Sequence, residues 1–190
     1  MKAVLLSIRP EWCKKILDGE KTVEVRRTCP VHGTPFKVYI YCTLAGSDSL
    51  FMDVLNRDVA AWNRGGWPEK RGRVIGEFTC DRITPLFNVC TDNWHHLAGD
   101  VHEWHKELIK RACLTDAELK AYAKGQNCFA WHISDLKIYD TPKPLSAFKG
   151  LCKIDVGCGE CPYYNYTKMD CDGRTIKRPP QSWCYVEELK

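Results

Sequence analysis

The sequence lacks long apolar runs, and this absence sets the first limits on the class of protein. No run among the 190 residues approaches the ~18 apolar residues of a membrane helix. The apolar stretch within residues 1–9 is also too short for a secretion signal. We therefore expect no membrane partner and a cytoplasmic protein.

The chain also has little net charge and lacks several catalytic motifs. Its 28 cations exceed its 24 anions by only four, whereas a protein that tracks duplex DNA makes about 6 to 10 phosphate contacts. Any contact with nucleic acid should therefore be local. The sequence has no G-x-S-x-G elbow, no phosphate-binding glycine loop and no H-E-x-x-H pattern. The histidines between residues 95 and 105 do not have that last spacing, which argues against a metal site there.

What is present predicts an α+β fold. With 44% apolar residues, a chain of this length can bury about 70% of its extended-chain surface. Period-two segments predict strands near residues 3–7, 21–26, 36–42, 73–83 and 129–139. Helical spacing predicts helices over residues 10–18, 50–59, 101–109 and 115–124. Strands and helices do not alternate strictly, so we expect a small, closed, mixed-direction barrel with helical insertions.

Glycine and proline mark several of these boundaries. Pro10 suits a first helical position, and Gly19 suits a left-handed helix end. Gly76 lies inside a strand pattern and indicates a bulge or a close backbone approach. The prolines at 142 and 144 are expected to stop regular structure, and a domain boundary is expected at residues 149/150.

The strand after Gly19 carries charges that an ordinary core strand would not. Val23 and Val25 face one way, while Glu24 and Arg26 face the other. Two residues apart on one strand face, these two side chains can interact and still offer hydrogen bonds to a ligand. This pattern is a candidate site.

Twelve cysteines divide into two groups. Seven are scattered singly in the first 150 residues and are expected to be buried thiols. In the tail, Cys158 and Cys161 have C-x-x-C spacing, and Cys171 and Cys184 can complete a tetrahedral site for structural zinc, with Cys152 as a rival ligand. Disulfides, thiol redox chemistry and unliganded thiols stay open as alternatives. Residues 150–190 are thus expected to form a cysteine-rich, possible zinc-binding module.

The residues at 19–26 resemble the mark of the ASCH domain family. That mark is G-x-K-x-x-E-x-R, which the chain matches at Gly19, Lys21, Glu24 and Arg26. Supporting matches are residues 7–10, the strand at 72–83 and residues 130–133 leading to 142–145. The resemblance covers residues 1–148 and implies a PUA-like barrel with a cleft that binds RNA or a modified nucleoside.

The family also contains enzymes. Some small bacterial members resemble amidohydrolases that deacylate a modified cytidine with a lysine and a threonine on this strand. Lys21 matches the lysine, but Glu24 occupies the threonine position. If the protein is an enzyme, the resemblance leaves Lys21 as base or electrostatic stabiliser, with Thr22 or Ser7 as a substitute hydroxyl.

Binding without catalysis is the first hypothesis. Glu24 beside Arg26 should stay ionised, and a carboxylate acceptor suits the exocyclic amino group of cytosine or adenine. The expected ligand contacts are Lys21, Glu24, Arg26, Arg9 and the two tryptophans Trp12 and Trp131. The alternatives are hydrolysis of an acylated nucleoside or of RNA, a protein-interaction module with an aromatic tail, and a purely structural ion pair with core tryptophans.

Overall fold

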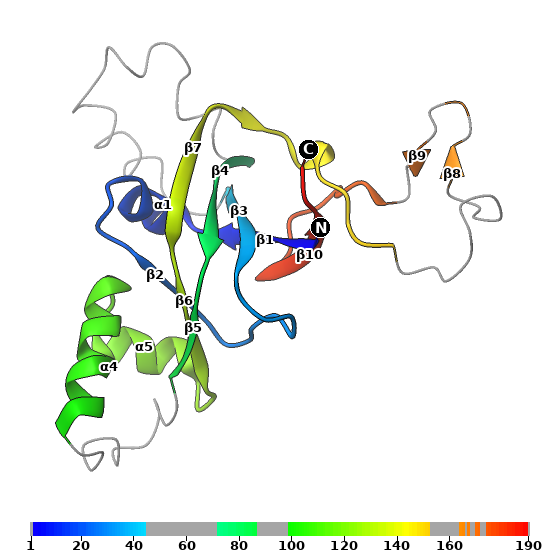
Figure 1. The fold of residues 1–190 in the computed structure, drawn as a ribbon. Coiled ribbons are helices and arrows are strands. Elements are labelled where there is room, and N and C mark those ends of the chain that lie inside the picture. Colours follow the sequence, from blue (N-terminus) through cyan, green and yellow to red (C-terminus); the bar gives the residue numbers. More distant parts are fainter. Residues whose placement is uncertain are drawn as a thin grey trace, which may run out of the picture. The chain divides into compact units, whose positions relative to one another are not determined.

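The computed structural model describes residues 2–44, 72–86, 99–152, 164–165, 167, 170–171 and 174–189 (Figure 1). These residues fall into two compact units. The first unit takes its described residues from Met1–Pro10, Lys37–Glu77 and Lys137–Lys190. The second takes them from Glu11–Phe36 and Phe78–Leu136.

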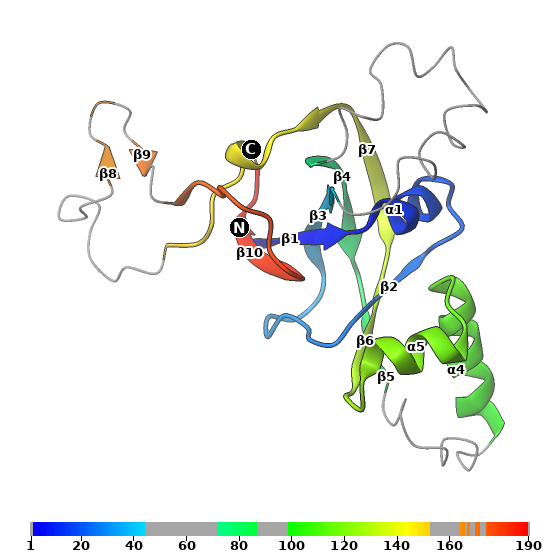
Figure 2. The same cartoon turned by 180° about the vertical axis from the view of Figure 1, so that it is seen from behind.

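The first unit is built on a five-stranded sheet with the order β10-β1-β3-β4-β7. Its strands are β1 (Lys2–Ile8), β3 (Phe36–Cys42), β4 (Arg73–Cys80), β7 (Ser134–Lys143) and β10 (Trp183–Glu187). β1 runs parallel to β3 and antiparallel to β10, and Figure 2 shows it beside both. The sheet's core cluster consists of Ala3, Leu5, Tyr39, Tyr41, Val74, Phe148 and Val186.

Smaller elements complete the described part of this unit. A 3-10 turn spans Leu145–Ala147, and a two-stranded ribbon pairs β8 (Tyr164–Asn165) with β9 (Asp170–Cys171). Whether residues 150–190 fold as a separate module stays a prediction. The structure nevertheless gives β10, from the end of that segment, a place in the five-stranded sheet.

Gly76 in β4 permits a close backbone approach, as its place in the strand pattern indicated. A Cβ atom at this position would lie 2.6 Å from the Lys137 carbonyl oxygen, and backbone cannot move aside cheaply. We expect Gly76→Ala to lower the free energy of unfolding by about 1 to 3 kcal/mol, measured by urea denaturation. Gly33→Ala is the control because nothing lies within 4 Å of a Cβ there. Equal stability of the two variants would contradict the prediction.

The second unit contains a three-stranded antiparallel sheet with the order β2-β6-β5. Its strands are β2 (Val23–Arg26), β6 (Cys128–His132) and β5 (Ile83–Leu86), and its helices are α1 (Pro10–Leu17), α4 (Gly99–Arg111) and α5 (Asp116–Ala123). One face of the sheet packs on α4 and α5. The core on that face contains Val23, Val25, Leu86, Leu108, Ala112, Leu119, Ala123, Cys128 and Ala130.

Several local signals are confirmed. Gly19 has φ +74° directly after α1, the left-handed conformation that favours glycine. Thr115 and Glu118 form the capping box that begins α5. Of the scattered cysteines that the structure describes, Cys13, Cys42, Cys80 and Cys128 are buried as expected, whereas Cys29 and Cys113 are only partly buried. The helix expected over residues 50–59 lies outside the described residues.

The closed barrel is wrong for the described residues, whose strands hydrogen-bond within separate sheets. The cause is that two segments, each predicted as one strand, contribute to two different sheets. Residues 81–82 separate β4 from β5, and Ile133 alone separates β6 from β7. Pro142 also does not end regular structure, since β7 runs to Lys143. β7 is an edge strand, where a missing N–H is tolerated.

No helix within the described ranges is long and apolar enough to cross a membrane.

Candidate functional site

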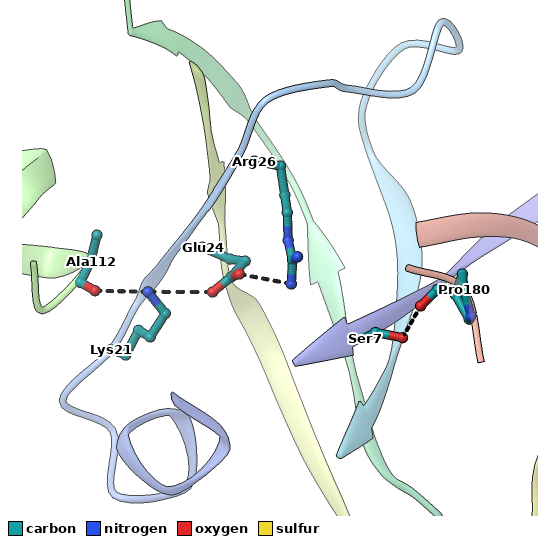
Figure 3. A network of polar contacts seen from close by, with 6 residues as sticks. All are labelled: Ser7, Lys21, Glu24, Arg26, Ala112 and Pro180. Atoms are coloured by element: carbon teal, nitrogen blue, oxygen red, sulfur yellow. Dashed lines mark hydrogen bonds and ion pairs between the residues drawn. The ribbon is translucent and has the colours of Figure 1, made fainter. Parts of the chain in front are cut away.

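β2 and the residues before it bring Lys21, Glu24 and Arg26 together (Figure 3). Arg26 Nη2 lies 2.9 Å from Glu24 Oε1, and Lys21 Nζ lies 3.3 Å from Glu24 Oε2. Each oxygen of the carboxylate therefore faces a cation. The ion pair that the strand spacing predicted is present, and Lys21 joins it from the other side.

These three charged side chains are buried. Their exposed fractions are 3% for Lys21, 6% for Glu24 and 9% for Arg26, which is unusual because charged residues are mostly exposed. A buried carboxylate requires compensation, and two cations provide it. We call Lys21, Glu24 and Arg26 the buried trio.

Lys21 also contacts two helical segments of the second unit. Its Nζ donates a 2.7 Å hydrogen bond to the carbonyl oxygen of Ala112, just after α4 ends. A cation is favourable at this end of a helix. The same Nζ lies 5.1 Å from the ring centroid of Trp12, in α1. No sequence pattern indicates the Ala112 carbonyl as a partner, because it is a backbone group 91 residues away.

One oxygen of the Glu24 carboxylate lacks a hydrogen bond within the described residues. Glu24 Oε2 is buried and accepts no hydrogen bond from the residues that the structure describes. Its nearest cation, Lys21 Nζ, directs a hydrogen bond to Ala112 instead. A buried acceptor without a hydrogen bond costs about 1 to 3 kcal/mol. A donor brought by a ligand would recover that cost.

The two tryptophans lie close to the buried trio, but they differ in burial, since Trp12 is only half-buried. Trp131 is the cross-strand partner of Glu24 and so lies on the same face of the sheet. It is fully buried, and its ring meets Phe36 edge-on with centroids 5.7 Å apart. Trp12 has Lys15 as well as Lys21 over its ring. Stacking of either ring on a base stays a prediction.

The candidate hydroxyl groups are held by other partners. Thr22 Oγ1 accepts a 3.0 Å hydrogen bond from Arg111 Nε. Ser7 Oγ donates a 2.6 Å hydrogen bond to the carbonyl oxygen of Pro180 (Figure 3). Neither contact is to a general base. Ser7 and the exposed Arg9 belong to the first unit, and their part in a common site stays a prediction.

The proposed zinc ligands are described only in part. Cys171 is buried in β9 and Cys184 is partly buried in β10, whereas Cys158 and Cys161 lie outside the described residues. Within the described ranges, no group of three or more His, Cys, Asp or Glu side chains could hold a metal ion. A four-thiolate site is therefore still a proposal that rests on the sequence.

Metal analysis tests that proposal. We expect about one zinc per chain in protein purified without added metal, and loss of zinc in Cys158→Ser and Cys161→Ser. Cys113→Ser is the control because this cysteine is one of the scattered group. Less than about 0.2 zinc per wild-type chain would remove the four-thiolate proposal.

Comparison with known proteins identifies the fold. No protein-family model matches the sequence, and no curated protein sequence matches it. The structure is similar to the crystal structure of ASCH from Zymomonas mobilis, with a TM-score of 0.55 and 20% identity, covering 98% of this chain and 88% of that chain. Two single-substitution variants of that protein also match, each with a TM-score of 0.55 and 19% identity. The match to the first variant covers 99% of this chain and 92% of the variant's chain. The match to the second covers 98% of this chain and 89% of the variant's chain.

At this level of identity the likeness concerns the fold. The chain has an ASCH fold, as its G-x-K-x-x-E-x-R segment implied.

Proposed function

We propose that this ASCH-fold protein binds a single-stranded RNA segment or a nucleoside, modified or not, beside Glu24, without catalysing a reaction. The observation that carries the proposal is the buried Glu24 carboxylate, whose Oε2 accepts no hydrogen bond from the described residues. An ionised carboxylate only accepts hydrogen bonds. The exocyclic amino group of cytosine or adenine is a donor of matching chemistry.

The two cations support this role for Glu24. Arg26 fixes Oε1 at 2.9 Å, so the carboxylate is already oriented before a ligand arrives. Lys21 uses one of its three N–H donors on the Ala112 carbonyl. Lys21 Nζ also lies 3.3 Å from Glu24 Oε2, and we expect a carbonyl or phosphate oxygen of the ligand to accept from its remaining N–H groups. Cytosine carries an amino group and a carbonyl group on the same edge, so it matches both Glu24 and Lys21.

The local chemistry favours binding over hydrolysis. A lysine acts as a base only after losing its proton, and the carboxylate 3.3 Å from Lys21 Nζ opposes that loss. Glu24 stands where the related amidohydrolases have threonine. The hydroxyl of Thr22 accepts from Arg111 instead of donating to a base. A protein-interaction role for the aromatic tail stays an alternative.

Calorimetry with a nucleoside panel and short single-stranded RNA tests the proposal. We expect a ligand with an exocyclic amino group to bind, and Glu24→Gln to weaken its affinity by about tenfold or more, because a hydrogen bond to a charged group is worth about 1.5 to 3 kcal/mol. Glu107→Gln is the matched control, since Glu107 is exposed on α4.

Two results would contradict the proposal. One is that no nucleoside or RNA binds; the other is that Glu24→Gln binds as tightly as Glu107→Gln. Turnover of an acylated cytidine by the wild type, lost in a folded Lys21→Ala variant, would establish hydrolysis in place of binding.

A further inference from the structure

A second polar cluster lies in the second unit, centred on His132 at the end of β6. His132 is 4% exposed. Its Nδ1 lies 3.1 Å from Arg82 Nη2, and its Nε2 lies 3.2 Å from Thr84 Oγ1. A guanidinium can only donate, so Nδ1 accepts and the ring proton is on Nε2, which donates to Thr84. Neutral His132 thereby holds the exposed Arg82 in place.

A second guanidinium comes from the end of α4. Arg111 Nε donates to Thr22 Oγ1 at 3.0 Å. The carbonyl oxygen of Thr22 accepts from the N–H of Ile133, the residue after His132. Arg111 is thus anchored beside the same end of the sheet, and among the described residues its terminal N–H groups have no hydrogen-bond acceptor.

The cluster has an excess of positive charge. Within the described part of the chain, neither Arg82 nor Arg111 lies within ion-pair distance of a carboxylate. Burial lowers the pKa of His132, and the charges of Arg82 and Arg111 lower it further, against a smaller opposite effect of Asp81. Burial also raises the pKa of the neighbouring Cys80 thiol to about 12, so this group stays neutral. Two cations therefore act on the neutral imidazole, Arg82 by direct contact and Arg111 through its charge.

In this cluster, His132 and Thr84 lie on the face of the sheet opposite to Glu24. His132 is the cross-strand partner of Val23, which packs on the helices. Glu24 follows Val23 in β2, and successive side chains in a strand alternate between faces. Thr84 pairs with Ala130, another residue of the helix-packed face.

We propose that Arg82 and Arg111 form a binding site for a phosphate group. Arginine presents a planar fork of donors that matches two phosphate oxygens, and it is weakly hydrated compared with lysine. A phosphate would pair directly with the two arginines, which no carboxylate of the described residues does, since Asp81 acts on the cluster only through its charge. The group can come from inorganic phosphate, a mononucleotide or an RNA backbone, which share this chemistry.

Calorimetry on the full chain tests the site with three probes: inorganic phosphate, cytidine monophosphate and a single-stranded octanucleotide. We expect Arg82→Gln and Arg111→Gln each to weaken phosphate affinity by about tenfold or more. Arg73→Gln is the matched control, because Arg73 is exposed on β4 in the first unit and carries the same charge. A stronger response to the octanucleotide identifies the RNA backbone as the source, and equal responses identify an isolated phosphate group.

A second measurement needs no variant. Phosphate bound between the arginines would offset their charges, so it should raise the pKa of His132, followed by NMR of the imidazole ring. Sodium chloride at matched ionic strength is the control for screening. Three results would overturn the proposal. The first is that none of the three probes binds, and the second is that the three arginine variants bind phosphate with equal affinity. The third is that phosphate and chloride have equal effects on the pKa of His132. Inorganic phosphate carries no base, so its binding tests this site separately from the nucleoside site.

Discussion

Replacing Glu24 with alanine is expected to lower the free energy of unfolding by about 3 to 5 kcal/mol, measured by urea denaturation. The substitution would leave Lys21 and Arg26, which are 3% and 9% exposed, without their shared anion. Removing one partner of a buried ion pair has this large effect because an uncompensated charge remains in a poorly solvated place.

A triple variant separates the charge effect from packing. Lys21→Met, Glu24→Leu and Arg26→Met together remove all three charges while keeping apolar volume. We expect this variant to be more stable than Glu24→Ala, although the Ala112 carbonyl loses its donor. It should bind no nucleoside. If Glu24→Ala changes the free energy of unfolding by less than about 1 kcal/mol, the trio does not function as a buried charge network.

Local structure followed from residues with strong conformational preferences. Gly19 ends a helix because glycine adopts positive φ at little cost, and its φ is +74°. Thr115 and Glu118 satisfy each other's backbone N–H groups whatever the tertiary context. Glu24 and Arg26 could be paired because their spacing on one strand is enough to bring them together.

The features that could not be predicted depend on contacts between distant parts of the chain. The sequence predicts one strand over residues 73–83, yet this range contains β4 and the start of β5, which pair in different sheets. Lys21 meets the carbonyl of Ala112, and His132 meets Arg82, without any motif that joins them. β10 pairs with β1 from the other end of the chain. The pattern of a strand indicates which of its faces is apolar, but it does not indicate which other strand pairs with it.

Deleting residues 150–190 is expected to lower the free energy of unfolding of the remaining chain by about 3 kcal/mol or more, or to unfold its first unit. β10 covers one edge of β1, and the fully buried Val186 belongs to the core of the five-stranded sheet. Burying such an aliphatic side chain contributes about 1.5 to 3 kcal/mol. The deletion also exposes the edge of an apolar strand, which invites association between chains.

Polar contacts after β10 add to this expectation. The N–H of Leu189 donates to the Tyr39 hydroxyl at 2.8 Å, and Glu188 Oε1 lies 3.1 Å from Lys37 Nζ. Both partners belong to β3, next to β1.

A point substitution tests the same contribution with the full chain present. Val186→Asp places a carboxylate in the core and should lower the midpoint of urea denaturation strongly, whereas Val31→Asp should not, because Val31 is 90% exposed. If residues 1–149 alone are monomeric and as stable as the full chain, β10 is dispensable, and the segment after residue 149 is an independent appendage rather than the edge of the sheet.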